Sequence, residues 1–160
     1  MFAPIPPKRL SSSSPSHRWC RVSCLPVRGS LMRIFIIGEN LKDLQIAADA
    51  ARSTGFNDIE AFVDVDPAMS LLKRALRGES PLPYAVILDL NQGPGNGYEL
   101  VRFWHSTRTQ ANIKMIVWSG LDERNRKMCS LFGVDLYVCK WEGERALREA
   151  LQRLNPSMGN

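Results

Sequence analysis

Residues 32–160 are predicted to form an α/β domain in which a five-stranded parallel sheet is doubly wound, with helices on both faces. Two observations predict this fold. Five short apolar runs follow one another along the chain, and between them lie stretches whose apolar residues recur at helical spacing. Such a β–α alternation favours a parallel sheet covered on both sides.

The five predicted strands are short and rich in Ile, Val and other apolar residues, as expected of strands buried on both faces. They span residues 33–38, 58–63, 84–90, 113–118 and 134–139. Because each is followed by a helical pattern, we expect every connection to be a β–α crossover.

The helical stretches each show one apolar face. In the first, Leu44, Ala47, Ala48 and Ala51 share a face. Asp66–Pro67 predicts the N-cap and first turn of the second helix, and Gly78 its end. The apolar faces of the third, fourth and fifth helices are formed by Leu100, Phe103 and Trp104, by Met128, Leu131 and Phe132, and by Ala146, Leu147, Ala150, Leu151 and Leu154.

Residues 1–31 differ in composition from the rest and are predicted to be a disordered, basic, Pro/Ser-rich tail. The tail resembles an organellar transit peptide, but we favour a translation start at Met32, because no clear amphipathic face is present. It holds five of the 21 basic residues and none of the 16 acidic ones, so residues 32–160 carry 16 of each. A neutral domain argues against direct nucleic-acid binding.

No apolar run approaches the roughly 18 residues that a membrane-spanning helix needs, so we expect no membrane association. His17, Cys20 and Cys24 could supply three metal ligands, but a structural zinc site needs a fourth, and we interpret this grouping as a coincidence. Cys139 lies in an apolar strand pattern and is expected to be a buried free thiol. A cytoplasmic location is the simplest interpretation.

Polar residues stand where four of the predicted strands end. Glu39 follows the first strand, Asp89 lies at the end of the third, Ser119 follows the fourth and Lys140 follows the fifth. In open α/β sheets, ligands bind beyond the carboxyl ends of the strands. We therefore expect two carboxylates, a hydroxyl and an ammonium group to meet at one edge of the sheet.

In order and spacing these residues resemble the active site of receiver domains from two-component response regulators of the chemotaxis type. The intervals are 30 residues from Asp89 to Ser119 and 21 from Ser119 to Lys140. Residues 89–100, DLNQGPGNGYEL, are similar to the phosphoacceptor strand, following loop and third-helix start of that family. The resemblance spans residues 32–160 and implies the flavodoxin-like receiver fold.

The resemblance implies a role for each site residue. Asp89 would be the phosphoacceptor, and Ser119 and Lys140 would contact the phosphoryl group. Mg²⁺ would be held by Glu39, by Asp89 and by the backbone carbonyl of Asn91. Tyr137, three residues before Lys140, would be the aromatic residue that switches position. Taken singly, each residue could instead have a structural role as a cap or a core side chain.

The implied function is phosphorelay signalling, without enzyme activity of its own. The phosphoryl group would come from a sensor histidine kinase or a phosphotransfer protein. Because few residues follow the fifth predicted helix, we expect a stand-alone receiver that docks a downstream protein through the face of the fourth helix, fifth strand and fifth helix.

Two departures from the family pattern bear on this function. The family usually has two adjacent acids after the first strand, where this chain has Gly38 and Glu39, so we expect weak Mg²⁺ binding and slow phosphotransfer. Trp141 stands where the family usually has proline; we expect Trp118 and Trp141 to be packing residues. A pseudo-receiver, an interaction module that works without phosphorylation, is therefore kept as an alternative.

Two further alternatives are disfavoured. A haloacid-dehalogenase-like phosphatase would need a second aspartate two residues after Asp89, where this chain has Asn91. A flavin-binding relative of the same fold would need a phosphate-cradling loop after the first strand, and residues 38–40 are too short and too acidic for one.

Overall fold

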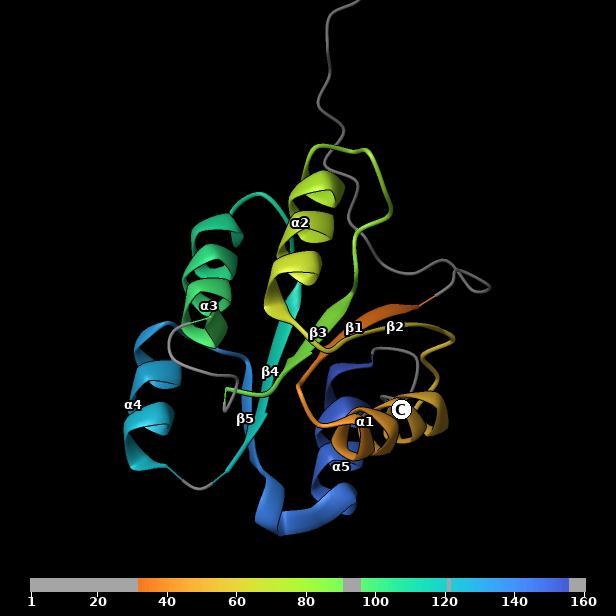
Figure 1. Ribbon diagram of the computed structural model, residues 1–160, viewed down its shortest axis with the longest axis vertical. Coiled ribbons are helices and arrows are strands. Elements are labelled where there is room, and N and C mark those ends of the chain that lie inside the picture. The colour runs from red at the N-terminus through yellow and green to blue at the C-terminus, as the bar shows by residue number, and fades with distance from the viewer. Residues whose placement is uncertain (1–31, 91–95, 121, 156–160) are drawn as a thin grey trace, which may run out of the picture.

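The computed structural model describes residues 32–90, 96–120 and 122–155, and the predicted tail at residues 1–31 lies outside these ranges (Figure 1). The strands are β1 (Arg33–Ile37), β2 (Asp58–Phe62), β3 (Ala85–Leu88), β4 (Lys114–Ser119) and β5 (Leu136–Cys139). The helices are α1 (Leu41–Ser53), α2 (Val65–Leu76), α3 (Asn96–Thr107), α4 (Glu123–Leu131), the short 3₁₀ helix η1 (Lys140–Glu142) and α5 (Gly143–Leu154).

The five strands form one parallel sheet in the order β2-β1-β3-β4-β5, which confirms the predicted fold class. From β1 the chain passes outward to β2 at one edge of the sheet. It then returns past β1 and adds β3, β4 and β5 in turn on the other side of β1. The order therefore reverses between β1 and β3. Ligand sites of open α/β sheets lie at such a reversal, beyond the carboxyl ends of the strands.

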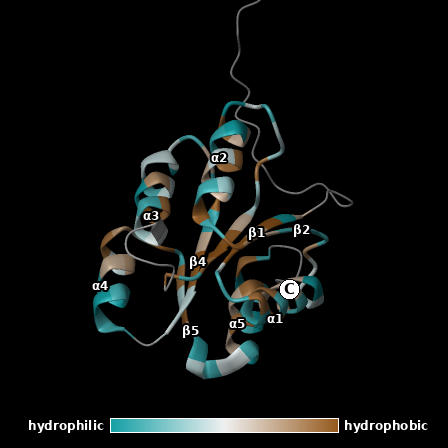
Figure 2. Ribbon diagram, viewed as in Figure 1, coloured by the Kyte–Doolittle hydropathy of each residue, from teal (hydrophilic) through white to brown (hydrophobic). Residues whose placement is uncertain are grey.

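Helices cover both faces of the sheet: α1 and α5 lie on one side, and α2, α3 and α4 on the other (Figure 1). Side chains alternate along each strand, so Ile34 and Ile36 of β1 join the layer with α1 and α5, while Phe35 and Ile37 join the opposite layer. Figure 2 shows the apolar strands at the centre of the molecule. Each fully buried side chain of this size contributes about 1.5–3 kcal/mol.

Helix α1 follows its predicted pattern and begins at a defined cap. Its predicted apolar residues are all buried. Asn40 is the N-cap, and its side-chain oxygen accepts hydrogen bonds from the backbone N–H groups of Lys42 and Asp43 at 2.9 and 3.3 Å. Three residues thus lead from the end of β1 into the helix, which brings the first turn of α1 close to the strand end.

The start of the second helix differs from the prediction. Asp64 is the N-cap of α2 and accepts the backbone N–H of Asp66, so Asp66–Pro67 lies within the first turn. Pro67 is tolerated there because the first N–H groups of a helix have no intrahelical partner. Gly78, with φ +79°, lies just after the helix, as predicted.

Two predicted packing residues are exposed, and those predictions were wrong. The buried residues of α4 are Asn125 and Cys129, so Leu131, about 200° around the helix from Cys129, faces away and is 81% exposed. Trp141 is 85% exposed because η1 lies beyond the end of β5 (Figure 1). Within the part of the chain described, no helix is long and apolar enough to cross a bilayer.

Candidate functional site

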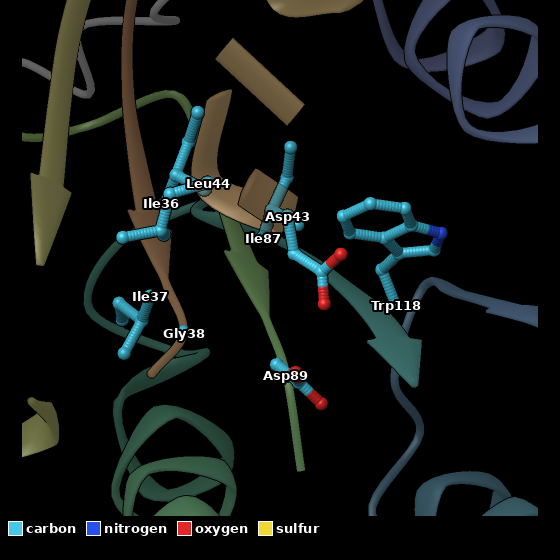
Figure 3. Close-up of a pocket in the computed structure, with 8 residues that line it drawn as sticks. All are labelled: Ile36, Ile37, Gly38, Asp43, Leu44, Ile87, Asp89 and Trp118. Carbon is cyan, nitrogen blue, oxygen red and sulfur yellow. The ribbon is translucent and has the colours of Figure 1, made fainter. Parts of the chain in front are cut away.

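A small pocket lies at the carboxyl edge of the sheet, where β1, β3 and β4 end beside the first turn of α1 (Figure 3). Its lining is Ile36, Ile37, Gly38, Asp43, Leu44, Ile87, Asp89 and Trp118. The apolar members belong to the strands and the buried face of α1. The two carboxylates in this lining come from different elements, one from α1 and one from the residue after β3.

Asp89 is fixed by the sheet. Its backbone N–H donates to the carbonyl of Ile37 at 2.9 Å, which continues the β1–β3 pairing by one residue, and the residue is only 8% exposed. The start of α3 packs closely behind it: a Cβ at Gly97 would lie 3.3 Å from Leu90 Cδ2 and 3.7 Å from the Asp89 carbonyl oxygen. A side chain at this position would therefore require Leu90 to shift by a few tenths of an ångström.

Lys140 holds two carboxylates together. It follows β5 directly, and its Nζ donates to Asp43 Oδ2 at 2.6 Å and to Asp89 Oδ2. The same Nζ lies over the Trp118 ring, 5.2 Å from its centroid. Burial lowers the pKa of Lys140, but hydrogen bonds and charge from Asp43 and Asp89 outweigh it, so the pKa is raised and the group is an ammonium at neutral pH.

Ser119, the last residue of β4, is fully buried, and its hydroxyl has no hydrogen-bond partner among the described residues. The buried indole N–H of the neighbouring Trp118 also has no hydrogen-bond acceptor among the described residues. An unsatisfied buried donor costs about 1–3 kcal/mol, so such groups need an explanation. One explanation is a ligand that supplies the missing acceptor.

Tyr137 of β5 is tied to the segment that follows Ser119. Its hydroxyl donates to the carbonyl oxygen of Gly120 at 2.7 Å, and its half-buried ring packs against the layer that contains α3 and α4. Burial raises the pKa of this phenol. The guanidinium of Arg126 on α4 lies 5.7 Å from the ring centroid. A displacement of the segment after β4 would therefore change the surroundings of Tyr137.

The structure brings together some of the predicted site residues. Asp89 and Lys140 are in contact, and Ser119 ends the strand between theirs. Glu39 is exposed in the bend after β1, and Asn91 lies outside the described residues. The metal roles predicted for Glu39, Asp89 and Asn91 remain predictions. Within the described ranges, no group of three or more His, Cys, Asp or Glu side chains is arranged to hold a metal ion.

Sequence reasoning missed Asp43. The search for polar residues considered strand ends, whereas Asp43 is the third residue of a helix. A signal was present, because helical side chains point back toward the helix N-terminus and α1 begins only four residues after β1. An acid in the first turn of such a helix is directed at the same edge of the sheet as the strand ends.

Comparison with solved structures identifies the fold; the sequence itself matches no protein-family model and no curated protein. A CheY-like receiver domain protein from Methanospirillum hungatei superposes with a TM-score of 0.65 at 20% identity, covering 81% of this chain and 97% of that one. The phosphorylated cyanobacterial phytochrome response regulator RcpA superposes with a TM-score of 0.63 at 23% identity, covering 77% of this chain and 90% of that one. The Mn²⁺-bound form of response regulator Rcp1 superposes with a TM-score of 0.63 at 18% identity, covering 77% of this chain and 91% of that one.

These likenesses establish that the described part of this chain has the fold of response-regulator receiver domains. The predicted flavodoxin-like receiver fold is therefore confirmed.

Proposed function

We propose that this protein is a phosphorelay receiver in which Asp89 accepts a phosphoryl group from a sensor histidine kinase or a phosphotransfer protein. The observation that supports this most is the position of Asp89: a buried carboxylate at the carboxyl edge of a receiver-type sheet, in contact with the Lys140 ammonium. The protein would act as a switch in signal transduction and not as an enzyme.

The proposed chemistry is transfer of one phosphoryl group. A carboxylate oxygen of Asp89 forms a bond to phosphorus while the bond from phosphorus to the donor nitrogen or oxygen breaks, and the donor leaves with the electron pair. The transition state spreads negative charge over three equatorial oxygens, so positioned cations supply most of the catalysis. Lys140 would move from the carboxylate to a phosphoryl oxygen, and the unpaired Ser119 hydroxyl would donate to another.

The donor set fits a divalent cation only in part. Mg²⁺ in proteins takes one or two carboxylates and keeps several waters. Asp43 and Asp89 both line the pocket, but both already contact Lys140, and Gly38 contributes only backbone. Glu39, Asp89 and the carbonyl of Asn91 are the residues we propose to hold the ion. When bound, it would neutralise charge that develops on the phosphoryl oxygens. We expect its affinity to be low.

The proposed output is a change in partner docking. Phosphorylation would draw Ser119 toward the phosphoryl group, shift the segment at Gly120 and release or redirect Tyr137, which donates to that carbonyl. We propose the α4–β5–α5 face as the surface that a downstream protein contacts. Leu131 on α4 and Trp141 in η1 are both exposed at or beside this face.

A pseudo-receiver remains the second candidate, because Lys140 bridges two carboxylates and Gly38 supplies no acid. Incubating the full chain with acetyl phosphate or phosphoramidate and Mg²⁺ separates the two functions. We expect intact mass to show one labile phosphoryl group that is lost in both acid and base, absent from Asp89→Asn and retained in the control Asp49→Asn, which alters an exposed acid on α1. Labelling that persists in Asp89→Asn, or acid-stable labelling on a hydroxyl, contradicts the assignment.

A further inference from the structure

The Lys140 ammonium is held from three sides, and one of the three is contributed by α1. Asp43 Oδ2 lies 2.6 Å from Nζ, Asp89 Oδ2 contacts the same nitrogen, and the Trp118 ring lies beneath it with its centroid at 5.2 Å. The lysine and Asp43 are 97 residues apart in sequence. In Figure 3 the Asp43 carboxylate is directed toward the Trp118 ring and Asp89.

This arrangement differs from an ordinary surface ion pair. An exposed pair contributes little because both side chains are solvated and must lose conformational freedom. Here the side chains are 21% (Lys140), 27% (Asp43) and 11% (Asp89) exposed, and the lysine Nζ lies over an aromatic ring. Asp43 is itself oriented by the Asn40 cap, which fixes the backbone of the first turn. The carboxylate is therefore pre-oriented toward the ammonium.

Gly38 explains why an acid from α1 can reach the site. It follows β1 and lines the pocket with backbone alone, so no side chain from this position stands between Asp43 and Asp89. The acid that the strand end lacks is thereby supplied from one helical turn further along the chain. Without Asp43, the carboxylate that holds Lys140 would be that of Asp89, which becomes an acyl phosphate when the phosphoryl group is transferred.

We infer that Asp43 is a positioning residue of this site: together with the face of Trp118, it keeps the Lys140 ammonium at the place where the phosphoryl group reaches Asp89. The inference rests on the proposed function of Asp89. Asp43 remains an anion during transfer, so it anchors the lysine stem while the ammonium exchanges its contact with Asp89 for one with a phosphoryl oxygen.

The test compares Asp43→Asn with Asp43→Glu, which restores the charge, and with Asp49→Asn, which removes an exposed acid from the same helix. In the full chain, ring current from Trp118 should move the Lys140 side-chain methylene protons upfield in NMR spectra. We expect Asp43→Asn to lose most of this shift, Asp43→Glu to keep much of it and Asp49→Asn to leave it unchanged. An Asp43→Asn spectrum like that of wild type overturns the inference.

The second measurement is the rate of labelling by acetyl phosphate with Mg²⁺. Misplacing a charge in a reacting site slows transfer, and we expect Asp43→Asn to be about ten- to a hundredfold slower, with recovery in Asp43→Glu. An unchanged rate also overturns the inference. If the wild-type protein is not labelled at all, the proposed function fails, whereas the NMR comparison still decides whether Asp43 positions Lys140.

Discussion

Replacing Lys140 by Met tests whether the ammonium holds the site together. Methionine keeps an unbranched stem of similar reach over the Trp118 ring but removes the positive charge. Asp43 and Asp89, which now share one ammonium, would then face each other without a counter-charge. We expect the variant to fold and to be less stable than wild type at pH 7.

The size of the effect follows from the contacts. Two oxygens that hydrogen-bond to one nitrogen lie within about 6 Å of each other. Two like charges at that separation repel by about 3 kcal/mol at an effective dielectric constant of about 20. Partial exposure of Asp43 and Asp89 reduces this, so we expect a loss of about 1–2 kcal/mol in the free energy of unfolding at pH 7.

Urea unfolding at pH 7 measures this loss in the free energy of unfolding. Lys114→Met is the matched control, because Lys114 Nζ lies 3.8 Å from a single carboxylate, that of Asp135. We expect the control to lose less than about 1 kcal/mol. Adding Asp43→Asn to Lys140→Met should restore stability at pH 7, since only one charge remains. A loss no larger than that of Lys114→Met, or no recovery in the double variant, would refute this account of the site.

Two further predictions concern the metal and the switch. Changing Gly38 and Glu39 together to Asp should tighten Mg²⁺ binding by about tenfold or more, because a carboxylate ligand is added. A titration followed by Trp118 fluorescence, with Trp118→Phe as control, measures the affinity. An unchanged affinity contradicts the prediction. Ser119→Ala should leave labelling of Asp89 largely intact but abolish the changes in NMR chemical shift around Tyr137 that we expect beryllofluoride to cause in wild type. Chemical-shift changes that persist in Ser119→Ala contradict the proposed coupling.

The fold was predictable because its signals are local. Short apolar runs and helical stripes predicted the five strands and the five α-helices, though not the 3₁₀ helix η1, and the alternation of the two predicted the parallel sheet. The errors arose where a side chain's surroundings depend on distant packing. Leu131 and Trp141 read as apolar packing residues, but the direction of α4 and the position of η1 leave both in solvent.

The candidate site was predictable where it depends on strand ends. Asp89 and Lys140 were expected to meet because carboxyl ends of parallel strands share one edge, and they are in contact. Asp43 was missed because its position depends on how α1 leaves β1 and on the backbone-only surface at Gly38. The one signal in the sequence was the short connection between β1 and α1, which directs an acid in the first helical turn toward the strand ends.

Borohydride trapping of the phosphorylated protein tests the central claim most directly. Borohydride reduces an aspartyl phosphate to homoserine, with release of phosphate, and leaves a free carboxylate unchanged. After treatment with acetyl phosphate and Mg²⁺, peptide mass spectrometry should find homoserine at position 89 and at no other aspartate. Conversion at another aspartate, or none at position 89 in protein that has gained a phosphoryl group, would show that Asp89 is not the phosphoacceptor.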